Sequence, residues 1–151
     1  YIYFKNKREI FLYSIKQLTQ DLESELRIII ADKEKLPSVR LTELMIKVLD
    51  KCIENNKLFN VLLTYLLQLK KSGKDPADRV RRRIVRLRHL LSMLLIEGIN
   101  SGEFKKINVK AVNEMLYSII ESSIFRMAIL GMTETEELKP VINLAIEGLK
   151  N

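Results

Sequence analysis

Apolar residues recur every three or four positions along most of the chain, the spacing that lines one face of an α-helix. The first such stripe predicts a helix over residues 6–31, with Asn6 as its N-terminal cap. A second stripe predicts a helix over residues 38–55, capped by Ser38. Residues 57–71 are apolar on nearly every side, which is typical of a helix surrounded by other helices. We therefore expect that helix at the centre of the fold.

The second half of the chain continues the helical pattern. A helix is predicted over residues 75–101, and Gly98 on its apolar stripe would let another helix approach closely. Gly102 suits the left-handed position just past the end of that helix. Asn108 can cap the next helix, which is predicted to end at about residue 130.

The start of the last helix has two interpretations. Thr133 and Glu136 match a capping box. Pro140 would either kink a helix that begins there or delay its start to about Lys139. Because no stretch alternates strictly between apolar and polar residues, we predict an all-α bundle of about six helices without strands.

The composition agrees with a single helical domain. The chain has 151 residues, enough for a real core, and only 5 Gly and 3 Pro. One cysteine, Cys52, excludes an internal disulfide and fits a reducing cytoplasm. No apolar run approaches the roughly eighteen residues that a membrane span needs. These features predict a cytoplasmic protein without a membrane partner.

The net charge of +7 has a local source, an arginine-rich helix over residues 79–88. A basic excess often marks a polyanion partner. At helical spacing Arg79, Arg82, Arg83 and Arg86 share a face opposite an apolar stripe, which is the pattern of a solvated face. No aromatic residues are interleaved for base stacking. The alternatives left open are a stand-alone helical adaptor or non-specific nucleic-acid-binding module, an acidic ligand, and salt bridges between helices. The residues are Arg79, Arg81, Arg82, Arg83, Arg86 and Arg88.

Residues with catalytic chemistry are sparse. His89 is the only histidine, and with one cysteine and no clustered carboxylates on a predicted face it forms neither a triad nor a metal site. No phosphate-binding loop or nucleophile elbow is present. We therefore expect no enzyme activity, no metal and no cofactor.

Two stretches carry a resemblance to a known family. The pattern formed by Tyr1, Tyr3, Phe4, Lys7 and Ile10 resembles the end of the helix-turn-helix domain of TetR-type transcriptional regulators, where the long connecting helix begins. The second stretch, at residues 98–104, reads Gly-Ile-Asn-Ser-Gly-Glu-Phe and is followed by a capped helix, as in the regulatory domains of that family. The distance along the chain between the two stretches is the one expected for that family.

The resemblance implies two parts. Residues 1–5 would be the remnant of a helix-turn-helix DNA-binding domain, most of which would precede Tyr1, and residues 6–151 would be a ligand-binding and dimerisation domain. Tyr1, Tyr3 and Lys7 would lie at DNA phosphates. The implied partners are operator double-stranded DNA, a small-molecule effector and a second copy of the chain.

The resemblance also implies a pocket among the helices. Its apolar lining suggests an apolar or amphipathic effector, with Met as an adaptable surface and Tyr and Cys as polar contacts. For any single residue a plain role in the core is the alternative. The candidates are Leu22, Met45, Leu49, Cys52, Leu62, Tyr65, Leu66, Leu91, Met93, Leu94 and Tyr117.

The last two helices are the candidate dimer interface, because members of the family build a four-helix bundle from them across a two-fold axis. An apolar face left uncovered there would otherwise form a large exposed patch. A purely intramolecular core is the alternative. The candidates are Ile119, Ile120, Ser123, Ile124, Met127, Leu138, Ile142, Ala145 and Leu149. The function implied is that of a repressor that its effector releases from operator DNA.

Overall fold

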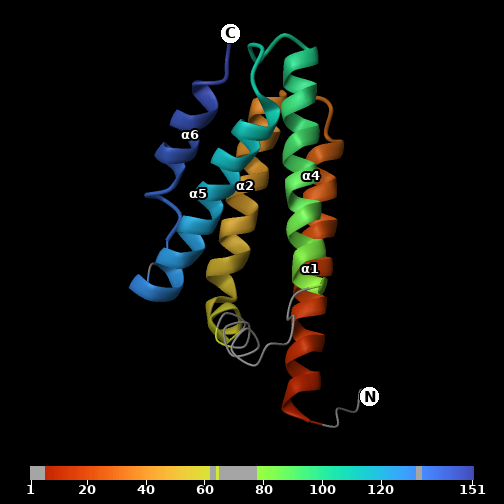
Figure 1. Ribbon diagram of the computed structural model, residues 1–151, viewed down its shortest axis with the longest axis vertical. Coiled ribbons are helices and arrows are strands. Elements are labelled where there is room, and N and C mark those ends of the chain that lie inside the picture. The colour runs from red at the N-terminus through yellow and green to blue at the C-terminus, as the bar shows by residue number, and fades with distance from the viewer. Residues whose placement is uncertain (1–5, 62–63, 65–77, 132–133) are drawn as a thin grey trace.

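The computed structural model describes residues 6–61, 64, 78–131 and 134–151. They form an all-α fold, as predicted, and no strand occurs among them. One isolated antiparallel bridge joins Phe104 to Lys150. The helices in chain order are α1 (Lys7–Ala31), α2 (Pro37–Glu54), α4 (Asp78–Asn100), α5 (Val109–Leu130) and α6 (Lys139–Glu147), and residues 56–61 are also helical (Figure 1).

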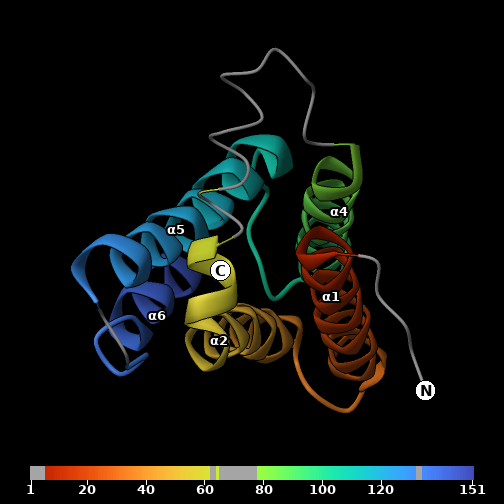
Figure 2. The same ribbon diagram turned by 90° about the horizontal axis from the view of Figure 1, so that it is seen from below.

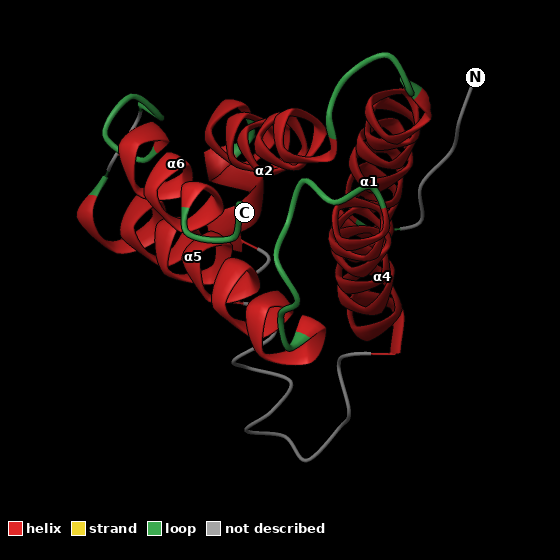
Figure 3. Cartoon of the chain, turned by 90° about the horizontal axis from the view of Figure 1, so that it is seen from above, coloured by secondary structure: helices red, strands yellow, loops and turns green. Residues whose placement is uncertain are grey.

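Helix α2 lies between two pairs of helices. The end views show α1 beside α4 on one side of α2 and α5 beside α6 on the other (Figures 2 and 3), and α2 contacts all four. The helix predicted at the centre, residues 57–71, falls mostly outside the described residues, so within them the central position belongs to α2. Its core side chains recur at helical spacing and are Leu41, Leu44, Met45, Val48, Leu49 and Cys52.

Several predicted helix ends are confirmed. The Asn6 side chain accepts a hydrogen bond from the Glu9 amide at 3.0 Å, and Asn108 accepts one from the Ala111 amide at 3.1 Å. Each cap satisfies one of the amides that a helix start leaves without a partner. Gly102 has a φ of 82°, which an L side chain rarely adopts, so glycine is required there.

The predicted cap of α2 was wrong. The helix begins at Pro37, before Ser38, and Leu36 at the cap position has no side-chain acceptor. Glu103 supplies the acceptor from the α4–α5 connection: it takes a hydrogen bond from the Ser38 amide at 2.8 Å and another from the Ser38 hydroxyl. A carboxylate is favourable at a helix start because of the helix dipole.

Of the two interpretations of the last helix, the later start is confirmed. Helix α6 begins at Lys139, and Pro140 lies in its first turn, where its missing amide proton costs no hydrogen bond. The proposed capping box therefore does not cap α6, and Thr133 lies outside the described residues. Glu136 instead pairs with Lys139 at 2.7 Å.

The segment after α4 joins three parts of the chain. The Phe104 amide donates to the Gly98 carbonyl at 2.9 Å, and the Lys105 amide donates to the Leu149 carbonyl at 2.9 Å. A Cβ atom at Gly98 would lie 2.1 Å from the Phe104 ring, so the group that approaches Gly98 closely is a side chain of the connection after α4 and not the predicted helix. Phe104 is fully buried as a result.

Candidate ligand-binding core and dimer face

The predicted DNA-contacting residues lie at the start of the chain. Tyr1 and Tyr3 are outside the described residues. Lys7 is the first residue of α1 and is exposed. Its ammonium group is therefore accessible to a phosphate, as the prediction requires.

Most described members of the predicted pocket share one apolar core. Met45, Leu49 and Cys52 from α2 meet Leu91 and Leu94 from α4, and all five are buried. Leu22 of α1 packs against this core and Tyr117 of α5 is part of it. The helices thus bring these residues together from four elements. Leu62, Tyr65 and Leu66 lie outside the described residues.

Met93 does not belong to this core. Its side chain is 43% exposed, although Leu91 and Leu94 beside it are buried. A step of two residues turns a helix by about 200°, which points Met93 away from the face that Leu91 lines. Its place in a pocket stays a prediction, but the apolar core described above does not include it.

Polar groups are concentrated where α4 meets α5. The guanidinium of Arg88 lies 4.3 Å from the centre of the Tyr117 ring, a cation–π contact. The Asn113 amide nitrogen donates to the Arg88 carbonyl at 2.7 Å and to the Ser92 hydroxyl at 2.6 Å. The Asn113 side-chain oxygen is buried without a partner in the structure. These contacts fix α5 against α4 at the edge of the core.

Two titratable groups in the core are held in their neutral forms. Burial raises the pKa of the Cys52 thiol to about 12. Burial also raises the pKa of Tyr117, with Glu121 acting in the same direction and Arg88 opposing it. A protonated, buried thiol is a poor nucleophile, so Cys52 acts as a core residue.

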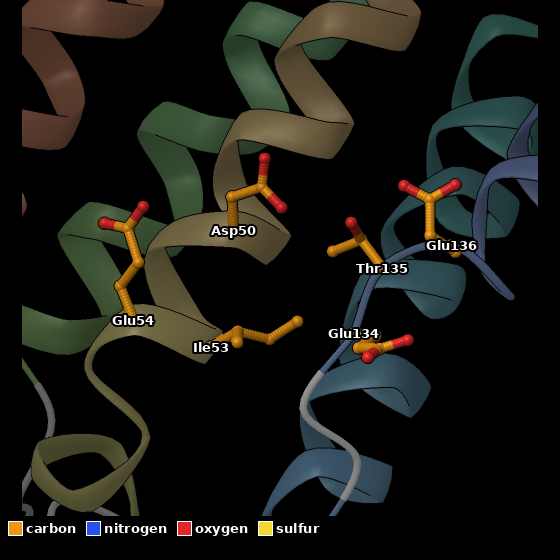
Figure 4. A pocket seen from close by; sticks show the side chains of 6 residues that line it. All are labelled: Asp50, Ile53, Glu54, Glu134, Thr135 and Glu136. Carbon is orange, nitrogen blue, oxygen red and sulfur yellow. The ribbon is translucent and has the colours of Figure 1, made fainter.

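An acidic cavity of about 230 Å³ lies between the end of α2 and the connection from α5 to α6 (Figure 4). The sequence pattern did not predict it, because its two walls are far apart along the chain. Its carboxylates would favour cations over anions. The lining residues are Asp50, Ile53, Glu54, Glu134, Thr135 and Glu136.

Two members of the arginine run are paired with carboxylates of other helices. Arg86 donates to Glu23 of α1 at 2.9 Å, and Arg88 pairs with Glu114 of α5. Salt bridges between helices were one of the alternatives for this run. The side chains of Arg79, Arg81, Arg82 and Arg83 lie outside the described part of the structure.

The residues predicted at the dimer interface lie in or against the core of their own chain. Six are buried there, and the other three are partly buried against the same core. All nine therefore lie in or against the core of their own chain, and their place at a dimer interface stays a prediction. The buried residues are Ile120, Ser123, Met127, Leu138, Ile142 and Leu149, and the partly buried ones are Ile119, Ile124 and Ala145.

Other apolar side chains of the same two helices are exposed. The most exposed are Leu144 at 77% and Leu130 at 74%. Large apolar side chains gathered on two neighbouring helices are typical of an interaction surface. We call this set the α5–α6 face: Met115, Phe125, Ile129, Leu130, Val141 and Leu144.

Within the described residues, no group of three or more His, Cys, Asp or Glu side chains could hold a metal ion. The described helices include none with the length and apolar character that crossing a membrane requires.

Comparison with solved structures identifies the fold. The structure is similar to a TetR transcription regulator from Haloarcula marismortui ATCC 43049, with a TM-score of 0.79 and 21% sequence identity, over 99% of this chain and 78% of that one. The chain therefore has the fold of TetR-type regulators, which confirms the resemblance at the level of the fold.

The sequence is also similar to the Fatty acid metabolism regulator protein of Bacillus subtilis (strain 168). The two are 25% identical over 129 residues, which cover 82% of this chain and 62% of that protein. The chain thus spans less than two thirds of that relative's length. No family model matches the chain.

Proposed function

We propose that this chain is the ligand-binding and dimerisation domain of a TetR-type repressor, joined at residues 1–5 to a helix-turn-helix domain. The observation that carries the proposal is the match of nearly the whole chain to the fold of a TetR regulator. The B. subtilis relative, which its name describes as a regulator, supports the same role. Lys7, exposed at the start of α1, would lie close to the DNA backbone.

The effector would enter the core between α1, α2, α4 and α5. The described side chains that meet there are mostly apolar, with Cys52 and Tyr117 among them, and buried Asn113 and Ser123 of α5 add polar groups beside them. Such a lining favours an apolar or amphipathic molecule. The name of the B. subtilis relative refers to fatty acid metabolism, so straight-chain fatty acids are the first effectors to test.

Two copies would pair through the α5–α6 face. Placing the exposed apolar side chains of both helices against a second copy would remove them from water. This assignment replaces the residues predicted from sequence with their exposed neighbours. It keeps the same two helices at the interface.

Binding of the effector would favour a state in which α1 is displaced. In a dimer, that displacement changes the separation of the two DNA-binding heads, which must match half-sites about 34 Å apart. A ligand shifts such an equilibrium only by its difference in affinity for the two states. Operator DNA must therefore weaken effector binding by the same factor that effector weakens operator binding.

This reciprocity is the test. Fatty acids of increasing length are titrated into the intact protein with and without operator DNA, and operator affinity is measured with and without each acid. We expect at least one acid to bind, with the two affinities reduced by equal factors. An acid that binds equally well in the presence and absence of operator contradicts the release mechanism, and an intact protein without operator affinity contradicts the regulator.

A further inference from the structure

Arg40 is a charged residue in the interior, with 2% of its side chain exposed. Its Nε atom donates to the Lys35 carbonyl at 2.9 Å, and its Nη1 atom donates to the Ile30 carbonyl at 3.0 Å. Its Nη2 atom pairs with Glu97 of α4, which also pairs with Lys33 at 2.6 Å. We call this group the Arg40 clamp: Arg40, Lys33, Glu97 and the carbonyl oxygens of Ile30 and Lys35.

The clamp joins three elements through one planar group. Ile30 is in the last turn of α1, whose carbonyls have no partner within the helix, and that turn contains no basic residue of its own. Arg40 of α2 supplies the missing donor and a positive charge where the helix dipole favours one. A guanidinium offers its donors in a fixed fork, so the bonds set a direction as well as a distance.

Because Arg40 is buried, breaking its contacts costs free energy. A buried charge without its partners is strongly unfavourable, so the end of α1 cannot separate from α2 and α4 without exposing or orphaning the guanidinium. Burial opposes ionisation of Glu97, but hydrogen bonds from Lys33 and Arg40 outweigh it and lower the pKa of this carboxyl. The clamp is therefore charged at neutral pH.

The rest of α1 is less buried. Leu26 is its one buried side chain among those described, and Leu22, Ile29 and Ile30 pack partly against the core. From Lys7 to Glu25 no described side chain is fully buried. Figure 1 shows this part of α1 continuing past the first described turn of α4. Burial along α1 is thus concentrated at the clamped end.

Two ion pairs of the described residues lie between these regions. Glu23 pairs with Arg86 of α4 at 2.9 Å, and Glu25 pairs with Lys51 of α2 at 3.2 Å. The Arg86 side chain is 56% exposed, and exposed pairs of this kind contribute little. The Glu23–Arg86 pair is therefore a weaker constraint on the direction of α1 than a buried guanidinium with three partners. Lys51 is 19% exposed, so the Glu25–Lys51 pair is less open to solvent, but it is a single contact.

We infer that Arg40 is the positioning residue of α1, which holds the C-terminal end of the helix fixed while the part before Leu22 turns about it as a lever. The distance from Ile30 to Lys7 is about 34 Å at 1.5 Å per residue, so a rotation of about 10° at the clamp moves the far end by about 6 Å. The inference concerns the geometry of the chain itself. It stands or fails separately from the proposed function.

The test measures distances within the 151-residue chain by double electron–electron resonance. Spin labels on cysteines at Ala31 and Asn100, both exposed, report the clamped end, and labels at Lys16 and Glu121, also exposed, report the far end. Cys52 is buried with a thiol pKa of about 12, so it does not compete for label. Dilution with unlabelled chain restricts the measurement to one copy.

In the unaltered chain we expect the far-end distance distribution to be at least twice as wide as the clamped-end one. Arg40→Met, which keeps an unbranched side chain as far as the position of Nε but has no donors, should widen the clamped-end distribution at least twofold. Glu97→Gln serves the same purpose if Arg40→Met does not fold. Lys139→Met, which removes an exposed pair elsewhere, is the control and should change neither distribution.

Three results overturn the inference. One is a clamped-end distribution as wide as the far-end one in the unaltered chain. Another is a folded Arg40→Met or Glu97→Gln chain whose clamped-end distribution stays narrow. A double Glu23→Gln, Glu25→Gln variant that widens the clamped end as much as Arg40→Met also overturns it, because the mid-helix pairs would then set the direction of α1.

Discussion

Two regions of the molecule, the surroundings of Arg40 and the α5–α6 face, differ in which kinds of side chain they bury. Around the Arg40 clamp, polar groups are buried and paired, and Phe104 is enclosed against Gly98. On the α5–α6 face, large apolar groups such as Phe125 are exposed. The first region is complete within one chain, whereas the second leaves its hydrophobic surface for something else to cover.

Because of this difference, we expect the first region to determine the stability of the single chain and the second to determine the association of two chains. Side chains at the clamped end contribute to folding, because their contacts exist in the single chain. Side chains of the α5–α6 face contribute less to the folding of one chain, since 41–77% of each is already exposed to water in the folded state. Substitutions of the same type in the two regions should therefore affect different measurements.

The strongest test compares two phenylalanines. Phe104→Ala should lower the free energy of unfolding by about 3–5 kcal/mol, because it leaves a cavity in a closed core. Phe125, 62% exposed, should change it by less than about 0.5 kcal/mol when replaced by alanine. Urea unfolding at a concentration where the chain is monomeric measures both. Equal losses would remove the distinction between the regions.

A comparison of two glycines tests how much stability depends on the close contact between Gly98 and the Phe104 ring. Gly98→Ala should lower the free energy of unfolding by about 1–3 kcal/mol, because the new methyl group would overlap the Phe104 ring. At Gly148 the nearest atom to an added Cβ is a carbonyl oxygen at 3.4 Å, so Gly148→Ala should be tolerated. Thermal unfolding of the two variants compares them, and a stable Gly98→Ala would show that the ring can move aside.

Association should depend on the other region. Leu144→Glu would place a carboxylate in the proposed interface and should weaken the dimer at least tenfold, about 1.4 kcal/mol. Asn143→Glu adds the same charge one residue away, on another side of α6, and is the control. Sedimentation equilibrium measures the dissociation constants. A dimer that tolerates Leu144→Glu would have its interface elsewhere.

The cap of α2 provides a smaller effect at the clamped end. Ser38→Ala removes the hydroxyl that donates to Glu103 but keeps the backbone amide bond. We expect a loss of about 1 kcal/mol, within the range for helix caps. Ser14→Ala, which removes a hydroxyl bonded only within α1, should change the unfolding midpoint less.

The sequence predicted what depends on local chemistry. The caps Asn6 and Asn108 and the turn at Gly102 were predicted because each signal lies within a few residues of the feature it forms. The acceptor for Ser38 could not be found in this way, since Glu103 lies 65 residues further along the chain.

The sequence pattern also could not show which face of each helix would be buried. Helix α5 is apolar on several sides, so periodicity could not show that Ile120 and Met127 would face their own core while Phe125 and Ile129 would face outward. Arg40 was missed for a related reason. A charged residue is expected at the surface, and its burial depends on partners from α1 and α4 that only the tertiary structure supplies.

The smallest expected effect is a pH dependence at the clamp. The pKa of Glu97 is lowered from its usual 4.5 in the folded chain, so its ionised form contributes stability that is complete above that value and is lost as the pH falls through the lower folded-state pKa. Glu97 is about one third exposed, at 31%, so we expect a contribution below about 1 kcal/mol. Glu97→Gln cannot titrate. The stability difference between the unaltered chain and this variant should therefore narrow as the pH falls below 4.5, as measured by urea unfolding at several pH values. A difference that stays constant across that range would show that the clamp holds α1 without help from the charge of Glu97.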